Sequence, residues 1–370
     1  MSFAEIYKGH DWEHIKGQIY SKEAHHVEAA LDKSGSRNLD DLMALLSPAA
    51  GPYLEDMARL SHDLTQKRFG KILQMYIPLY LSNRCSNNCL YCGFRNENRI
   101  KRITLTEDQV LDEINIIKSH GFDHILLVTG ESGTNAGIEY FEKVLKLIRP
   151  FFSHISMEVQ PMNREEYSRL TKLGLNTVLI YQETYGKNYP EFHPGGMKSD
   201  FFYRLETPDR LGTAGVHKIG LGCLLGLDDW RTDSWFVGLH VNYLEKKYWK
   251  TKYSISFPRL RPATGIIEPR VIVSDRDLVQ LICAYRIFNE NLELSLSTRE
   301  AEKFRNNAIK FGITSISAGS KTEPGGYSAK TCELEQFEVN DSRTPEQIAE
   351  MISSQGYEPV WKDWDIHYGI

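Results

Sequence analysis

The 370-residue sequence has no apolar run of the roughly 18 to 20 residues that a bilayer-spanning helix needs. Its opening stretch, MSFAEIYKGHDWEHIKGQ, contains no apolar core of the kind found in secretory signals. The formal net charge of -5 argues against nonspecific binding to nucleic acid or to an anionic membrane. No internal repeat and no low-complexity segment is present. These absences predict a cytoplasmic globular protein with no nucleic-acid or membrane partner.

Cysteine is scarce, with six in the chain, which is not the composition of a secreted disulfide framework. Three of the six nevertheless fall within eight residues, in the stretch LSNRCSNNCLYCGF, as Cys85, Cys89 and Cys92. Four ligands would close a tetrahedral zinc site, so the absence of a fourth cysteine is the feature that most needs an explanation.

The pattern of apolar residues changes near residue 72. Before it, NLDDLMALLS and YLEDMARLSHDLTQKRFG have apolar residues at intervals of three and four, which predicts helices. After it, short apolar runs alternate with amphipathic segments such as TEDQVLDEINIIKSHG, where Thr106 and Gln109 have capping-box spacing. Eight short runs are candidate strands: 75–81, 124–128, 154–159, 177–181, 217–222, 253–257, 292–296 and 313–317.

Strands that alternate with helices predict parallel pairing through right-handed crossovers, and eight such units predict an α/β fold of the closed (β/α)8 TIM-barrel type. The alternative is an open, doubly wound sheet. We expect an N-terminal helical extension over 1–71, the barrel over 72–330, and a C-terminal extension over 331–370 that packs on the barrel. Barrel enzymes carry their chemistry at the carboxyl ends of the strands, and the cysteine stretch directly follows the first predicted strand.

An iron–sulfur cluster explains the three cysteines better than zinc does. The nearest histidine after the stretch is His120, beyond a predicted helix, and no second C-x2-C follows, so a zinc site lacks its fourth ligand. Thiolates are the usual ligands of a 4Fe–4S cube, and three of them leave one iron open to a further ligand. Cys223 and Cys283 lie in apolar surroundings and are expected to be inert.

The stretch CSNNCLYCGF, with Tyr91 before its last cysteine and Phe94 at its end, resembles the signature of the radical S-adenosylmethionine (SAM) superfamily. The resemblance implies a 4Fe–4S cluster on the three cysteines, with SAM on the open iron and Tyr91 and Phe94 near the cofactors. It implies reductive cleavage of SAM to a 5′-deoxyadenosyl radical. It also implies a reducing partner of the flavodoxin or ferredoxin type.

Several residues at predicted strand ends match positions that contact SAM in that superfamily. Gly130 and Glu131, in VTGES, match a pair that meets the SAM amino group. Glu158 matches a residue that bonds the ribose, Arg204 matches an arginine that pairs with the SAM carboxylate, and Gly222 lies in a segment that approaches the adenine. The alternatives are structural: a turn with Glu131 as a loop charge, packing for Glu158, and a glycine-rich segment that binds no ligand for Gly222.

Eight motifs between residues 78 and 327 extend the resemblance to the radical SAM aromatic amino-acid lyase group, and within it to the tyrosine lyases of thiamine biosynthesis. The motifs are PLYLSNRCSNNCLYCGFRNEN, VTGES, YQETY, FFYRLETPDRLGTAG, IGLGCLLGLDDWR, SFPRLRP, LSLSTRE and ISAGSKTEPGGY. The implied reaction cleaves the Cα–Cβ bond of L-tyrosine to give 2-iminoacetate (dehydroglycine) and p-cresol. The 2-iminoacetate is destined for the thiazole moiety of thiamine, with a thiazole synthase as protein partner.

The loops after the seventh and eighth predicted strands are a favoured anion site in barrels. Arg299 follows the seventh strand, and Ser317 and Ser320 lie at the end of the eighth. A guanidinium can bind a carboxylate through two hydrogen bonds and a serine can add a third, so we expect these residues to hold the substrate carboxylate. The alternative is that Arg299 simply opens the next helix, although a cation in a first turn opposes the helix dipole.

Three more residues are expected at the same mouth of the barrel. Tyr80 closes the first strand beside the cysteines, and Glu183 and Tyr185 follow the fourth strand. We expect all three to line the substrate pocket, with a core position as the alternative for Tyr80.

Other functions of related iron–sulfur proteins would require different sets of cysteines or a different fold. The tyrosine lyase of hydrogenase maturation begins with the same cleavage but needs a second cluster on C-terminal cysteines, and Cys332 is the single cysteine beyond residue 300. Sulfur insertion of the biotin-synthase kind would need a second thiol set. A non-catalytic electron carrier would normally have four thiolates and a small fold. A tryptophan lyase would share the carboxylate site and stays an open alternative.

Overall fold

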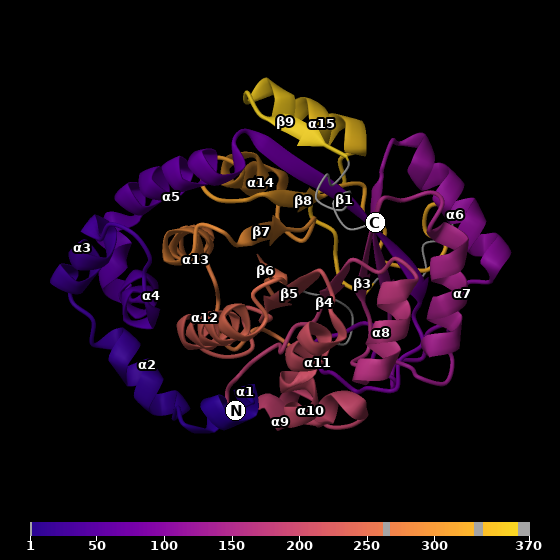
Figure 1. Cartoon of the computed structure of the whole chain (residues 1–370), viewed down its shortest axis with the longest axis horizontal. Coiled ribbons are helices and arrows are strands. Elements are labelled where there is room, and N and C mark those ends of the chain that lie inside the picture. The colour runs from indigo at the N-terminus through magenta and orange to yellow at the C-terminus, as the bar shows by residue number, and fades with distance from the viewer. Residues whose placement is uncertain (1, 262–266, 329–335, 362–370) are drawn as a thin grey trace.

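Eight parallel strands close into a ring in the computed structural model, which describes residues 2–261, 267–328 and 336–361. Strands β2 to β8 pair in order, and β1 pairs with both β2 and β8, so the ring has no gap. Helices surround it (Figure 1). The predicted (β/α)8 barrel is therefore confirmed. Its strands are β1 (Ile72–Ser82), β2 (His124–Thr129), β3 (His154–Glu158), β4 (Thr177–Leu179), β5 (Lys218–Gly222), β6 (Lys252–Ser256), β7 (Glu293–Leu296) and β8 (Ser315–Ser317).

All eight predicted strands are present, and their ends differ only slightly from the prediction. The largest shift is at the start of β1, which begins at residue 72 instead of 75. The sequence missed β9 (Glu358–Val360), which pairs in parallel with the first residues of β1. Three residues containing a proline are too few to show strand periodicity, so only the pairing reveals this strand.

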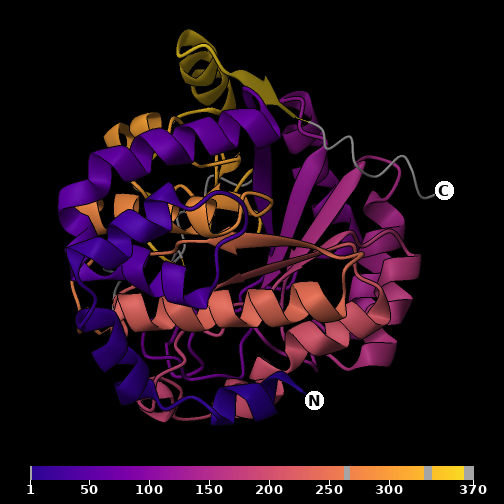
Figure 2. The ribbon, with the colours of Figure 1, turned by 60° about the vertical axis from the view of Figure 1, so that its left-hand side comes forward.

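The N-terminal helices lie outside the barrel helices along one side of the molecule (Figures 1 and 2). Both α4 and α5 pack on α13, and Leu42, Leu45 and Leu46 of α4 are fully buried. Burying a leucine side chain stabilises a fold by about 1.5–3 kcal/mol, so this apolar contact holds the extension firmly. The elements are α1 (Phe3–Lys8), α2 (Trp12–Tyr20), α3 (Ala24–Asp32), α4 (Leu39–Leu46), the 3-10 helix η1 (Pro48–Tyr53), α5 (Leu54–Phe69) and α13 (Asp275–Phe288).

The remaining barrel helices begin where the sequence supplies caps. Thr106 and Gln109 bond each other's backbone amides at the start of α6, and Asn163 and Glu166 do the same at α8, so both predicted capping boxes are confirmed. Between β4 and β5 the chain adds short elements beside the barrel mouth. The barrel helices and these short elements together are α6 (Glu107–Ser119), α7 (Ile138–Ile148), α8 (Arg164–Lys172), α9 (Tyr189–Phe192), η2 (Met197–Ser199), α10 (Phe201–Leu205), α11 (Thr207–Ala214), α12 (Trp230–Lys247) and α14 (Glu302–Ala308).

The C-terminal segment lies on the outside of the barrel, where α15 (Pro345–Ser354) and β9 sit beside β1 (Figure 2). The fully buried Arg305 of α14 pairs with Asp341 and donates to the carbonyl of Ser317, which ties this segment to β8. The division into regions 1–71, 72–330 and 331–370 stays a prediction. Over the described ranges, no helix is long and apolar enough to cross a membrane.

Candidate active site

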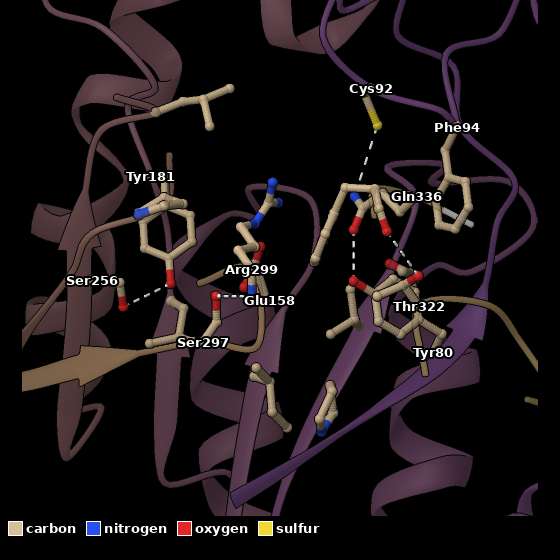
Figure 3. A pocket seen from close by; sticks show the side chains of 18 of the residues that line it. Tyr80, Cys92, Phe94, Glu158, Tyr181, Ser256, Ser297, Arg299, Thr322 and Gln336 are labelled. Carbon is tan, nitrogen blue, oxygen red and sulfur yellow. Dashed lines mark hydrogen bonds between the residues drawn. The ribbon is translucent and has the colours of Figure 1, made fainter. Parts of the chain in front are cut away.

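A cavity opens at the carboxyl ends of the strands, which is the end of the barrel where the sequence placed the chemistry. It brings together side chains from all eight strands or the loops that follow them. Figure 3 shows several of these side chains from close by. Most of the residues singled out from the sequence line it: Tyr80, Cys85, Cys89, Tyr91, Cys92, Phe94, Gly130, Glu131, Glu158, Glu183, Arg204, Arg299, Ser317 and Ser320.

The three clustered cysteines line one wall of this cavity, in the loop that leaves β1. Burial raises the pKa of Cys85 to about 11 and that of Cys89 to about 12, so both thiols are neutral at pH 7 until a metal displaces their protons. Gly130 lies against this loop, and a Cβ on it would stand 2.4 Å from the carbonyl oxygen of Arg84. Only glycine allows this close approach.

A buried network of two carboxylates and two cations adjoins the cysteines. Arg204 Nη1 lies 2.8 Å from Glu131 Oε1, and Lys198 Nζ lies 2.6 Å from Glu183 Oε1. Asn87 donates its side-chain amide to Glu131 Oε2 at 2.7 Å. Burial by itself would raise the pKa of Glu131, but the charges of Arg204 and Lys198 hold it below its usual value. Two carboxylates and two cations balance each other, so the network is close to neutral in sum.

The chain makes a sharp turn at Glu183, just beyond β4. Its φ of 71° is the single positive φ of a non-glycine residue in the described part of the chain. Such conformations cost about 1–3 kcal/mol and gather at functional sites. The turn aims the Glu183 carboxylate into the cavity, where Lys198 holds it.

The same turn overturns the prediction for Tyr185. Its side chain is 1% exposed, donates or accepts a 3.0 Å hydrogen bond at His240 Nδ1, and stacks on Phe236 in the core beside α1 and α12. Strand β4 ends at Leu179, so the alternation of a strand no longer decides which way Tyr185 points.

Gly222 also has a different role from the predicted one. It is not among the described residues that line the cavity. A Cβ on it would lie 2.7 Å from the carbonyl oxygen of Ser256 and 3.1 Å from the ring of Tyr181. The glycine therefore permits close packing of β5 against β6 and the end of β4, which is the structural alternative.

Glu158 ends β3 with its carboxyl group in the cavity, and no hydrogen-bond partner for it is present among the described residues. Burial raises its pKa to about 7, although the nearby Arg299 acts in the opposite direction. A half-buried acceptor that faces a cavity without a protein partner is expected to meet a ligand.

Arg299 lies on the opposite side of the cavity, in the loop after β7. Its guanidinium lies over the ring of Phe337, 3.3 Å from the ring centroid, and within the described residues no carboxylate comes within 4 Å of it. Helix α14 begins later, at Glu302, so the alternative that Arg299 opens that helix is wrong. The neighbouring Glu300 is 1% exposed and paired with Arg259 and Arg261, which fixes the loop.

The two predicted serines have different surroundings. Ser317 accepts the backbone N–H of Thr298 at 3.0 Å, so its hydroxyl joins the loops after β7 and β8. Ser320 Oγ is buried with no hydrogen-bond partner in the described structure, and so is Thr129 Oγ1 at the end of β2. Unpartnered hydroxyls that face a cavity indicate groups that bond a ligand.

Sequence reasoning missed two residues of this site. Lys198, in the 3-10 helix η2, is 8% exposed, and nothing in its local sequence predicts that burial. Gln336 lies between Cys92 and Tyr80 in Figure 3: its amide donates to Cys92 Sγ at 3.8 Å, and its oxygen accepts from the Tyr80 hydroxyl at 2.6 Å. This contact crosses 256 positions of sequence, so no local pattern signals it.

These residues fit the cofactors that the cysteine motif implies. Three thiols line one wall of the cavity, and Gly130 lies directly against their loop. The adjoining ion pairs contain carboxylates that can bind an amino group and cations that can bind a carboxylate. An open iron would thus have a zwitterion-binding surface next to it.

Comparisons with known proteins agree with this geometry. Residues 79–234 match the Radical SAM superfamily, and residues 256–358 match the Biotin and Thiamin Synthesis associated domain. The barrel and its cysteine-lined mouth therefore define a radical SAM enzyme, a class that binds a 4Fe–4S cluster and SAM. The chain is 51% identical over its whole length to the 2-iminoacetate synthase of Escherichia coli (strain K12), covering 98% of it. It is 50% identical to the protein of the same name from Salmonella typhimurium, again covering 98%. The chain belongs to the 2-iminoacetate synthase family.

Solved structures show the same fold. The crystal structure of HydG, a maturase of the FeFe-hydrogenase, superposes with a TM-score of 0.92 at 32% identity. The superposition covers 96% of this chain and 81% of that HydG. The HydG of Carboxydothermus hydrogenoformans gives a TM-score of 0.87 at 29% identity, covering 99% of this chain and 84% of that one.

Proposed function

We propose that this enzyme cleaves the Cα–Cβ bond of L-tyrosine to 2-iminoacetate and p-cresol, for the thiazole moiety of thiamine. The family supports the reaction, and one structural observation carries the assignment to this cavity. The half-buried Arg299 cation lines the same cavity as the cysteines and has no carboxylate partner among the described residues. A cation partly withdrawn from water and left without a counter-ion is costly, so its presence indicates a place for an anionic substrate group.

Cys85, Cys89 and Cys92 would hold the 4Fe–4S cluster, and with three protein thiolates the cluster would keep one iron open to SAM. When bound and reduced, this pair supplies the 5′-deoxyadenosyl radical. The Glu131 and Glu183 carboxylates accept from the SAM amino group, and Arg204 lies where it can balance the SAM carboxylate. Tyr91 and Phe94 form the aromatic wall on the cysteine side of the cavity.

Glu158 accepts from the ribose hydroxyls, and the substrate binds across the cavity from the cysteines. The Arg299 fork grips the tyrosine carboxylate, and the Ser320 hydroxyl adds a donor. Ser317 acts indirectly, because its hydroxyl holds the backbone of the Arg299 loop in place. Tyr80, held by Gln336, forms a wall of the substrate pocket.

A thiazole synthase is the proposed protein partner, because a free imine hydrolyses in water and needs prompt transfer. A low-potential one-electron carrier of the flavodoxin or ferredoxin type is the proposed reductant. The cytoplasmic location expected from the unpaired, clustered cysteines belongs to the same proposal.

An anaerobic assay tests the proposal. The reconstituted, reduced enzyme is incubated with SAM and L-tyrosine, and we expect 5′-deoxyadenosine, p-cresol and glyoxylate, the hydrolysis product of 2-iminoacetate. Formation of 3-methylindolic acid from tryptophan, with no p-cresol from tyrosine, would reassign the substrate. Production of carbon monoxide and cyanide would instead indicate the hydrogenase-maturation reaction, which the likeness to HydG keeps as the second candidate.

A further inference from the structure

The barrel interior beneath the candidate active site is unusually polar. TIM barrels normally fill this space with layers of bulky, branched apolar side chains. Here the inward-facing residues of the lower layers include two histidines, a lysine and a glutamate. The polar residues that line this interior include Gln74, His124, His154, Lys218, Glu293 and Ser295.

Three cavities lie in succession between the base of the barrel and the active site, and neighbouring cavities share lining residues. The basal cavity, of about 500 Å³, shares Gln74 and Glu293 with a middle cavity of about 40 Å³. The middle cavity shares Tyr76 and Ser295 with the candidate active site. Alternate residues of β1 trace this route, because Gln74, Tyr76 and Tyr80 face inward at successive levels.

Hydrogen-bonding side chains line the route at each level. The Lys218 ammonium lies 2.8 Å from the Glu293 carboxylate near the base. Above them, His154 Nε2 lies 2.8 Å from Thr177 Oγ1, and the His124 and His154 rings are 4.2 Å apart between centroids.

Two more pairs continue the route to the active site. His124 Nε2 lies 2.9 Å from Ser156 Oγ, and the Tyr76 hydroxyl lies 3.2 Å from Ser295 Oγ at the floor of the active site. Each of these groups can either both donate and accept a hydrogen bond or exchange a proton with a neighbour. An imidazole accepts at one nitrogen while it donates at the other, and a cavity of about 40 Å³ has room for about two or three waters to link the pairs.

The proposed reaction requires a proton inside a closed pocket. Loss of one hydrogen atom from the amino nitrogen to the adenosyl carbon would leave a nitrogen-centred radical. Its Cα–Cβ bond would then break to give 2-iminoacetate and leave the aromatic fragment as a benzylic radical. To become p-cresol, that CH2 group must gain one electron and one proton. The electron comes from the one-electron reductant, and the proton must come from an exchangeable source.

We propose that the polar column on the barrel axis, from Glu293 through His154 and His124 to Tyr76 and Ser295, conducts this proton from the basal solvent to the benzylic carbon. The inference rests on the proposed function and adds a route to it. Exposed residues such as Trp249 line the basal cavity, so solvent reaches the base of the barrel. SAM and the substrate, when bound, would fill the upper mouth.

The test separates the steps before proton uptake from the step that needs it. 5′-Deoxyadenosine and glyoxylate report hydrogen abstraction and bond cleavage, whereas p-cresol also reports proton delivery. His154→Gln keeps a hydrogen-bonding side chain of similar size that does not relay a proton, and Tyr76→Phe removes only the last hydroxyl. We expect both variants to retain 5′-deoxyadenosine and glyoxylate while p-cresol per 5′-deoxyadenosine falls about fivefold or more, with a benzylic radical accumulating in electron paramagnetic resonance spectra.

His240→Gln is the matched control, because His240 is another buried histidine but lies on α12, where it stacks on Phe3 outside the barrel axis. It should leave the product ratio unchanged. Tyr76→Phe keeps the test decisive if His154→Gln does not fold. A wild-type ratio in both column variants, or a parallel fall of all three products, would overturn the proposed column.

Isotope labelling gives an independent readout. In D2O the wild-type p-cresol should carry one deuterium in its methyl group, and a methyl group without deuterium would overturn the proposal. A wild-type enzyme that forms 5′-deoxyadenosine from tyrosine but no p-cresol would instead refute the proposed function itself, so the two failures are distinguishable.

Discussion

The two sides of the active-site cavity differ in whether their charged side chains have partners of opposite charge. On the cysteine side, Glu131 and Glu183 are paired with Arg204 and Lys198. On the far side, Arg299 has no carboxylate partner among the described residues. The paired residues are buried, and Arg299 is half-buried.

This difference indicates two kinds of ligand. The paired side is close to neutral and offers donors and acceptors together, which suits the zwitterionic end of SAM. The unpaired side presents one cation and unbonded hydroxyls, which suits a carboxylate. The paired side should therefore matter mainly for folding and SAM binding, and the unpaired side mainly for substrate binding.

The largest expected effect comes from the cysteine wall itself. Cys89→Ala leaves two thiolates, which should not hold a cube, so we expect loss of most bound iron and of all 5′-deoxyadenosine formation. Cys283→Ala is the control, because Cys283 is fully buried in α13, away from the cavity. Iron content and 5′-deoxyadenosine yield measure the effect, and an active Cys89→Ala enzyme would refute the cluster assignment.

Arg204→Met should destabilise the fold strongly, because it leaves the Glu131 carboxylate buried without its closest cation. Breaking a buried pair on one side typically costs about 3–5 kcal/mol. Urea unfolding of the cluster-free protein measures this cost. The exposed pair between Arg59 and Glu55 gives the contrast, since Arg59→Met should cost less than about 1 kcal/mol. Equal losses for both variants would contradict the distinction between paired and solvent-screened charges.

Arg299→Met should have the opposite profile. Unfolding free energy should change little, because no protein carboxylate loses its partner. The KM for tyrosine should rise about 30-fold or more, since removing one member of a buried charged contact costs about 2–5 kcal/mol. Arg299→Lys keeps the charge but not the fork, and should recover part of the affinity. A normal KM in Arg299→Met would exclude Arg299 from the substrate site.

Ser320→Ala should have a smaller effect of the same kind. A single neutral hydrogen bond contributes about 1 kcal/mol, so the KM for tyrosine should rise roughly fivefold. Stability should be unchanged or slightly higher, because the hydroxyl has no hydrogen-bond partner in the described structure. A clear loss of stability would show that Ser320 has a structural role instead.

The raised pKa of Glu158 predicts a modest dependence of stability on pH. Burial raises its pKa from 4.5 to about 7, so the folded state binds a proton that the unfolded state releases. Its contribution to stability is present below pH 4.5 and is lost as the pH rises through about 7. Urea midpoints of the cluster-free protein at pH 5 and pH 8 should therefore differ more for the wild type than for Glu158→Gln. Equal differences would show that Glu158 is not the group responsible.

Sequence periodicity predicted the elements of the fold because each depends on neighbouring residues. Thr106 with Gln109 capped a helix as expected, and the eight apolar runs became the eight strands. The short strand β9 had no periodicity to read. The predicted direction of Tyr185 was wrong for a related reason: the positive φ at Glu183 ended the alternation two residues earlier.

The candidate site could be predicted only in part. The cysteine spacing and the strand-end positions of Glu131, Glu158 and Arg299 placed these residues at one mouth. Neither Lys198 nor Gln336 carried a signal, because a polar residue in a loop has the same local sequence whether it is buried or exposed.

By itself, the sequence determined the barrel, the three-cysteine loop and the strand ends that face it, because spacing along the chain sets backbone periodicity and thiol proximity. The tertiary structure alone decided which charges are paired. Arg204 meets Glu131 across 73 positions, whereas Arg299 meets no carboxylate in the described residues. It also decided that the barrel core is a polar column, since a serine or a histidine in a strand becomes part of a connected route only when eight strands turn their inward faces to one axis.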